Sequence, residues 1–258
     1  MEHISAIIIT RNEEKNIAAC VRSVKPFSDE VLVIDSSSTD RTVPISRGLG
    51  CRVLVRKFDT FIHQKNFGLS MARFNMVFFI DADERVPPAL AATIAAIKRK
   101  GFARDAYRIP RRNMYLARRA WYGGWGSDRM YFLFDRRKCR YEGTAVHERL
   151  ATGGASIGQL GPFVLHAPYE DLGHHLRKID VYSRLFASAR AGRKRPFLAL
   201  EILFRPVFKF VKCYVVQGAF IAGWRGLIFS AMASFSVFMK YARLLEMKMS
   251  GTAGRKRR

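Results

Sequence analysis

Three short apolar runs, each ending in a polar or acidic cluster, constrain most strongly what this chain can fold into. Residues 4–10 (ISAIIIT) lead into Arg-Asn-Glu-Glu, residues 30–35 (EVLVID) into Ser-Ser-Ser-Thr-Asp, and residues 76–80 (MVFFI) into Asp-Ala-Asp-Glu. Continuous β-branched and aromatic runs of this length are typical of parallel strands that are buried on both faces. We therefore expect an α/β fold built on a mostly parallel, doubly wound sheet.

Helical segments separate the predicted strands. A helix is expected to reach residue 24 from Asn12, which would be its N-cap, with two glutamates in its first turn. A further strand at residues 51–56 and a helix near residues 67–72 continue the alternation. Ligands bind beyond the carboxyl ends of the strands in such sheets, so we expect the polar clusters to converge on one site.

Charge is divided unevenly along the 258 residues. Residues 1–95 carry 12 basic and 11 acidic side chains, whereas residues 96–258 carry 33 basic and 10 acidic ones. This asymmetry predicts an anionic partner for the second half of the chain. The four cysteines are far apart and form no CxxC pair, which excludes a zinc ribbon or a disulfide scaffold. We expect no signal peptide and a reducing, cytoplasmic setting.

Asp81 and Asp83 follow a hydrophobic strand, one residue apart. Two carboxylates in such a loop are typical ligands of Mg²⁺ or Mn²⁺, which often share them with substrate phosphates. The alternative is a surface loop in which this pattern occurs by chance. Asp35 ends another buried strand and is expected to bind a nucleobase or ribose. Asp40, five residues on, is as well explained as a helix N-cap.

The motifs TRNEE (residues 10–14), VIDSSSTDRT (33–42) and FIDADE (79–84) together resemble those of family 2 glycosyltransferases with the GT-A fold. Gln64-Lys65-Asn66 is similar to the branch of lipopolysaccharide core β-1,4-glucosyltransferases. The resemblance covers residues 4–190 and extends more weakly to about residue 246. It implies a Rossmann-like, mostly parallel nucleotide-sugar domain with a C-terminal amphipathic helical extension.

The resemblance also implies roles for individual residues. The donor would be a UDP-sugar, with its base and ribose surrounded by Thr10, Asn12, Glu13 and Asp35, and with Lys65 near the base or diphosphate. Asp83 would be the principal ligand of Mg²⁺ or Mn²⁺, and Asp81 would face the ribose or the metal. His166 matches a late histidine that completes the metal site in such enzymes, although a lone histidine after a short apolar strand is also commonly structural.

An inverting transfer needs a general base to take the proton of the acceptor hydroxyl. Glu148, in Val-His-Glu, is the predicted base and Asp128 is its rival. The alternative for Glu148 is an ion pair with one of the many arginines. Trp121, Tyr122 and Trp125 are expected to form an acceptor-binding loop, or else a simple aromatic core.

The predicted organisation has a catalytic domain at residues 1–190, with a nucleotide-sugar half (1–95) and an acceptor half (96–190). Residues 191–250 form a helical membrane-associating region, and residues 251–258 a basic disordered tail. Uncharged runs of 12 and 14 residues, at 213–224 and 226–239, are shorter than the roughly 20 residues that span a bilayer. We therefore expect amphipathic helices in the interface, although one tilted span through Arg225 remains an alternative. The basic residues expected near lipid headgroups are Lys209, Lys212, Arg225, Lys240 and Arg243.

The residues themselves predict a metal-nucleotide site and an anionic, lipid-like partner, and the resemblance implies an inverting hexosyltransferase, peripheral on the cytoplasmic face of the inner membrane. It would move glucose from a UDP-sugar to an anionic glycolipid, the heptose of the lipopolysaccharide inner core. The alternatives are another lipid-linked or exopolysaccharide acceptor, or a sugar nucleotidyltransferase. No nucleic-acid partner is expected, because the sequence shows no zinc-finger, RNP or helix-turn-helix signature.

Overall fold

The computed structural model describes residues 2–116, 118–125, 128–144, 147–192 and 196–250. The chain divides into two compact units. The first unit contains Met1–Arg112 and Ser127–His166, and the second contains Asn113–Gly126 and Ala167–Arg258. The predicted basic tail at residues 251–258 lies outside the described residues.

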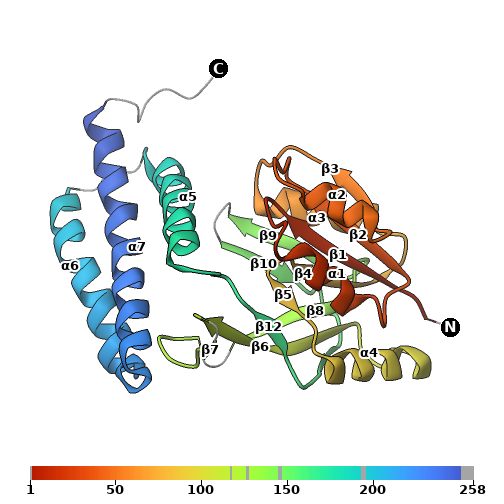
Figure 1. The fold of residues 1–258 in the computed structure, drawn as a ribbon. Helices are drawn as coiled ribbons and strands as arrows, with labels where there is room; N and C mark the ends of the chain where they lie inside the picture. Colours follow the sequence, from red (N-terminus) through yellow and green to blue (C-terminus); the bar gives the residue numbers. More distant parts are fainter. Residues whose placement is uncertain (1, 117, 126–127, 145–146, 193–195, 251–258) are drawn as a thin grey trace. The chain divides into compact units, whose positions relative to one another are not determined.

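A mixed sheet forms the centre of the first unit (Figure 1). Its strand order is β3-β2-β1-β4-β8-β6-β12-β5, and β11 also pairs with β6. The strands β3, β2, β1 and β4 are mutually parallel, whereas β8 runs antiparallel to β4 and β6. The bounds are β1 (Ile4–Thr10), β2 (Glu30–Asp35), β3 (Arg52–Val55), β4 (Met76–Asp81), β5 (Glu84–Arg85), β6 (Ala106–Tyr115), β8 (Arg129–Asp135), β11 (Ile157–Gln159) and β12 (Val164–His166).

Helices cover both faces of this sheet. Successive side chains of a strand point to opposite faces, so an apolar run such as β1 presents apolar side chains to the helices on each side. Ile4, Ala6 and Ile8 of β1 pack with the helices α1 (Ile17–Val24) and α4 (Pro88–Lys100). Ile7, between them in the sequence, packs on the other face with α3 (Phe61–Met71). The short helix α2 (Thr42–Gly48) joins β2 to β3. The predicted α/β architecture is therefore confirmed.

The predicted start of α1 is wrong. Its N-cap is Asn16, and no acidic residue lies in its first turn. Asn12 instead takes a left-handed backbone conformation, with φ of 54°, and its side chain binds the loop after β2. The N-cap signal was outweighed by a contact with a segment 27 residues away, which the local sequence does not reveal.

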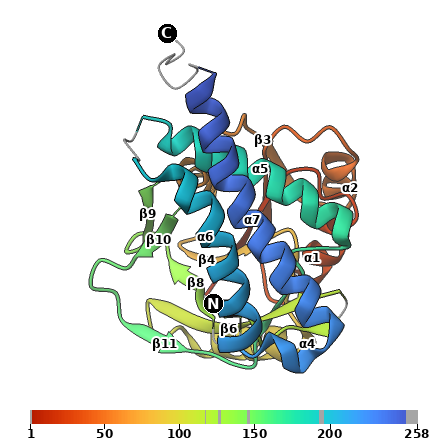
Figure 2. The same cartoon turned by 90° about the vertical axis from the view of Figure 1, so that its left-hand side faces the viewer.

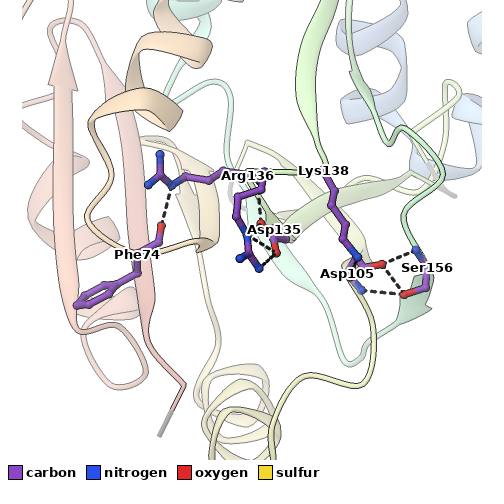
Figure 3. Close-up of polar contacts among 7 residues, drawn as sticks. Phe74, Asp105, Asp135, Arg136, Lys138 and Ser156 are labelled. Atoms are coloured by element: carbon purple, nitrogen blue, oxygen red, sulfur yellow. Dashed lines mark hydrogen bonds and ion pairs between the residues drawn. The ribbon is translucent and has the colours of Figure 1, made fainter.

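Ion pairs and hydrogen bonds connect the segments at the end of the sheet where β1 and β4 begin (Figure 3). Arg136 Nε donates to the carbonyl of Phe74 at 3.1 Å, which ties the end of β8 to the segment before β4. Lys138 Nζ donates to Asp105 at 2.7 Å, and Asp105 accepts two hydrogen bonds of 2.8 Å from Ser156. The polar groups at this end of the sheet therefore stabilise the fold. The candidate site lies at the opposite ends of the parallel strands.

A separate hairpin of β9 (Arg140–Thr144) and β10 (His147–Ala151) packs on the α3 side of the first unit. The side chain of Asn66 on α3 binds both backbone groups of Tyr141 on β9. Its Nδ2 donates to the Tyr141 carbonyl at 2.8 Å, and its Oδ1 accepts from the Tyr141 amide at 2.9 Å. This paired contact fixes the hairpin to the helix.

The second unit consists mainly of helices (Figure 2). Its long helices are α5 (Leu172–Arg190), α6 (Leu198–Val211) and α7 (Trp224–Met249). A π-helical turn (Lys212–Val216) and a short 3₁₀ helix (Ala219–Ala222) link α6 to α7, which lie side by side. The end of β6 and the short strand β7 (Arg118–Arg119) also belong to this unit.

An aromatic core holds the second unit together. Tyr115, Tyr122 and Phe229 are buried, and each ring meets its neighbours edge to face. His175 hydrogen-bonds Tyr115 Oη through Nδ1 at 3.3 Å, and burial lowers its pKa to about 4. Gly123, with φ of 66°, packs so tightly that an added Cβ would lie 2.1 Å from the Phe229 ring.

Apolar side chains are exposed along one side of α6. We define the α6 apolar face as Phe197, Leu200, Leu203, Phe204, Val207, Phe208 and Val211; each of these residues is 46–69% exposed. The helix α7 is long and apolar enough to cross a membrane, by length and composition. Arg243, predicted to lie near headgroups, forms an ion pair with Asp180 on α5.

Candidate active site

The parallel strands align three site residues at one edge of the sheet. Thr10, the last residue of β1, is in register with Asp35, the last residue of β2. On the other side of β1, Ile9 is in register with Asp81 at the end of β4. The structure therefore places these polar strand ends side by side, as the sequence predicted.

The loops after β1 and β2 are joined by side-chain to backbone hydrogen bonds. Asn12 Oδ1 accepts from the Thr39 amide at 2.8 Å, and the Asn12 amide donates to Ser38 Oγ at 2.8 Å. The amide of Glu13 donates to Thr42 Oγ1 at 2.8 Å, while its carboxylate accepts from Asn16. Asn12 and Glu13 thus connect the loop after β1 to the loop after β2.

Asp35 is fully buried and is held by its own loop. Its carboxylate accepts hydrogen bonds from the Ser38 amide at 2.8 Å and from Ser38 Oγ at 2.5 Å. Asp40 accepts from the amide of Thr42, the first residue of α2, but the N-cap of this helix is Arg41, so the interpretation of Asp40 as the N-cap is wrong. Thr10 Oγ1 is buried with no hydrogen-bond partner among the described residues.

The loop after β4 gathers carboxylates in a protected position. Asp83 and Glu84 are buried, and Glu84 accepts a hydrogen bond from the Asp81 amide at 3.0 Å. Burial raises the pKa of Asp81, with a further rise from the Asp83 carboxylate and an opposing effect of the Lys65 ammonium. Burial and the nearby Asp81 likewise raise the pKa of Glu84.

His166 reaches this loop through strand pairing. It lies opposite Glu84 where β12 pairs with β5, and its Nε2 is 3.8 Å from Asp83 Oδ1. Within the described part of the chain, no three His, Cys, Asp or Glu side chains are already arranged to hold a metal ion. Mg²⁺ and Mn²⁺ commonly take only one or two protein carboxylates and complete their coordination with substrate phosphates. The excess of buried carboxylate at Asp81, Asp83 and Glu84 fits such a cation.

Lys65 and Glu148 form the centre of the site on the α3 side. Lys65 Nζ donates to Glu148 Oε1 at 3.0 Å, and both side chains are largely buried. The ammonium also lies over the Tyr141 ring, 4.9 Å from its centroid. Lys65 and Glu148 both act electrostatically on Asp81. The partner of Glu148 is therefore this lysine, and not one of the arginines that the sequence offered.

Arg111 is a site residue that the sequence analysis missed. Its guanidinium donates to Asp128 at 2.7 Å and lies 3.7 Å from the Glu84 carboxylate. It is one of many arginines in the second half of the chain, and nothing in its local sequence marks it. Asp128, the rival base, is thus ion-paired with Arg111, and the same guanidinium places a positive charge beside the acidic loop.

The predicted acceptor loop belongs to the second unit. Tyr122 is buried against Phe229, and Trp125 stacks on Tyr169 and meets Phe229 edge to face. Trp121 is 49% exposed. The alternative of an aromatic core therefore describes the packing of Tyr122 and Trp125, whereas Trp121 is half-exposed and meets Tyr122 edge to face.

The sequence of this chain is similar to those of known glycosyltransferases. The profile described as "Glycosyl transferase family 2" matches residues 5–151. An uncharacterized glycosyltransferase of Rickettsia typhi is 27% identical, covering 96% of this chain and 89% of the relative. The lipopolysaccharide core biosynthesis glycosyltransferase LpsC of Rhizobium meliloti is also 27% identical, covering 94% and 92%. The crystal structure of S. aureus TarS 1–349 in complex with UDP-GlcNAc covers 99% of this chain and 93% of its own, with a TM-score of 0.45 and 13% identity. Because the family profile spans more than half of the sequence, the protein is a member of glycosyltransferase family 2, with the GT-A fold.

Proposed function

We propose that the protein is an inverting glycosyltransferase that moves a hexose, glucose in our assignment, from a UDP-sugar to the heptose of a lipopolysaccharide inner core. The observation that carries the proposal is the convergence of Asp35, Asp81 and the Lys65–Glu148 pair at one edge of the sheet. The similarity to LpsC supports a lipopolysaccharide core acceptor.

The donor nucleotide would lie along the ends of β1 and β2. Asp35, already ordered by Ser38, would accept hydrogen bonds from the base or ribose, and Thr10 Oγ1 would gain the partner that it lacks among the described residues. Lys65 and Arg111 would supply positive charge to the diphosphate. A cation held by Asp83 and Asp81, with His166 beside them, would neutralise the charge that develops on the leaving diphosphate.

Glu148 would act as the general base. The acceptor oxygen forms a bond to the anomeric carbon while the bond from that carbon to the diphosphate oxygen breaks. The bonding electron pair leaves with the nucleoside diphosphate, and the hydroxyl proton moves to Glu148. Attack from the face opposite the leaving group inverts the anomeric configuration. Glu148 is favoured over Asp128 because its partner Lys65 lies on the helix that also contacts the loop after β2, and because the charge of Glu148 contributes to the raised pKa of Asp81.

The second unit would hold the enzyme on the cytoplasmic face of the inner membrane. The α6 apolar face would enter the lipid interface, and by helical spacing Arg205 and Lys212 border it toward anionic headgroups. Residues 96–190, including the exposed ring of Trp121, would contact the acceptor. This arrangement suits an acceptor that is itself a phosphorylated glycolipid in the same membrane.

A mass-spectrometric transfer assay tests the proposal. Purified protein with Mg²⁺ or Mn²⁺ would be offered UDP-, GDP- and dTDP-sugars together with deacylated, heptose-containing lipopolysaccharide core. A hexose-sized mass gain with UDP-glucose is expected. A gain only with another acceptor would overturn the heptose assignment, and folded protein that turns over no donor would overturn the function.

A further inference from the structure

The Lys65 ammonium lies in a cage formed by two aromatic rings and the Glu148 carboxylate. Only 13% of its side chain is exposed, and its ammonium lies 4.9 Å from the Tyr141 ring centroid and 5.8 Å from that of Phe79. Within this cage its hydrogen-bond acceptor is Glu148, at 3.0 Å. The one ammonium thus holds the group that we assign as the base.

The same ammonium faces the donor side of the site. Asp81, at the end of β4, raises the pKa of Lys65 together with Tyr141 and Glu148, although burial opposes this effect. The ammonium therefore interacts electrostatically with two carboxylates: Asp81 at the strand end, where a diphosphate would lie, and Glu148 on the hairpin. A diphosphate carries more negative charge than one carboxylate, so it would compete effectively for this cation.

We propose that Lys65 is a donor-responsive positioning residue that holds Glu148 in the free enzyme and exchanges it for the diphosphate when the donor binds. The inference rests on the proposed function and adds to it a change of partner for Lys65. In the free enzyme Lys65 occupies one oxygen of Glu148, and release of that oxygen leaves the whole carboxylate able to accept the hydrogen bond and the proton of the acceptor hydroxyl.

No proton is transferred in this exchange. Lys65 remains an ammonium in both positions, and its hydrogen bond to a carboxylate is replaced by one to a phosphate oxygen. Glu148 remains a carboxylate until it takes the acceptor proton during transfer. The energetic cost to the donor is the breaking of the Lys65–Glu148 ion pair, and that cost can be measured by removing the pair.

The test is a double-mutant cycle on nucleotide binding, measured by titration calorimetry with UDP and Mn²⁺. The proteins are wild type, Glu148→Gln, Lys65→Met and the double variant. Glu148→Gln is expected to bind UDP about five-fold more tightly than wild type, because no ion pair must be broken first. In the Lys65→Met background, the same Glu148→Gln change is expected to give little or no gain.

Other outcomes would overturn the inference in distinguishable ways. Equal tightening in both backgrounds would mean that Glu148 simply repels the diphosphate, and weaker binding by Glu148→Gln would mean that Glu148 serves only to orient Lys65. Failure of folded wild type to bind UDP, GDP or dTDP would remove the proposed function itself. Glu142→Gln, an exposed carboxylate on the same hairpin, is the matched control and should bind like wild type. Lys65→Gln replaces Lys65→Met if thermal melting shows that the latter fails to fold.

Discussion

Replacing two aromatic residues of the α6 apolar face should detach the protein from membranes. Phe204 and Phe208 are 61% and 69% exposed, so about two-thirds of each side chain is available to lipid. Full burial of a phenylalanine contributes roughly 1.5–3 kcal/mol. Insertion of both exposed portions is therefore worth about 2–4 kcal/mol, and Phe204→Ser with Phe208→Ser should weaken vesicle binding by about 30- to 700-fold.

Flotation with phosphatidylethanolamine–phosphatidylglycerol vesicles measures this partitioning directly. The matched control is Val181→Ser with Tyr182→Ser, which removes two exposed apolar residues from α5, outside the proposed membrane region. The control should bind vesicles like wild type. Raised salt should weaken the wild-type interaction, because part of it comes from basic residues near anionic headgroups.

Two results would refute the reasoning. Vesicle binding by the α6 variant within a few-fold of wild type would show that this face does not enter lipid. Equal losses of vesicle binding in the α6 and α5 variants would show that removing exposed apolar side chains anywhere on the protein weakens binding. If the α6 variant still resisted extraction from native membranes, a transmembrane α7 would replace the interfacial arrangement, since α7 is long enough to span.

The remaining predictions concern catalysis and folding. Asp83→Asn should reduce transfer by about 100- to 1,000-fold, because the leaving diphosphate loses its metal clamp, and should weaken Mn²⁺-dependent UDP binding in calorimetry. Glu148→Gln should bind UDP but lose about 100- to 10,000-fold in turnover, and the same behaviour in Asp128→Asn would transfer the role of base. Gly123→Ala should lower the unfolding free energy by about 2–4 kcal/mol in denaturant titration, because it adds a Cβ in a left-handed conformation against an aromatic ring. His175 has a lowered pKa of about 4, so stability should fall as pH decreases from about 6.5 toward 4, and His175→Gln should flatten that dependence in chemical denaturation.

The nucleotide half of the fold was predictable because its strands are buried on both faces. Continuous apolar runs gave β1 and β2 to the residue, and placed Asp35 and Asp81 at strand ends. The helix α4 was not predicted, although Pro88 at its first turn and Gly101 after its end are recognisable signals. Local patterns are sufficient wherever burial alone decides the structure.

The second half of the site depends on contacts between distant segments. The β9–β10 hairpin has no alternating apolar pattern, and it is held through Asn66, 75 residues from the Tyr141 backbone that it binds. Arg111 meets Asp128 across 17 residues and Lys65 meets Glu148 across 83 residues. Periodicity carries no information about such pairs, so the sequence singled out Lys65, Glu148 and Asp128 but neither their partners nor Arg111.

Three consecutive residues of α3 link the parts of the site that the sequence separates. Gln64 donates to Ser36 in the loop after β2, Lys65 holds Glu148 on β10, and Asn66 binds the backbone of β9. Successive helical side chains point about 100° apart, so one turn of α3 contacts the loop after β2, Glu148 and the hairpin together. In the proposed function, this single turn would contact both the loop that binds the nucleotide and the residue that acts as the base.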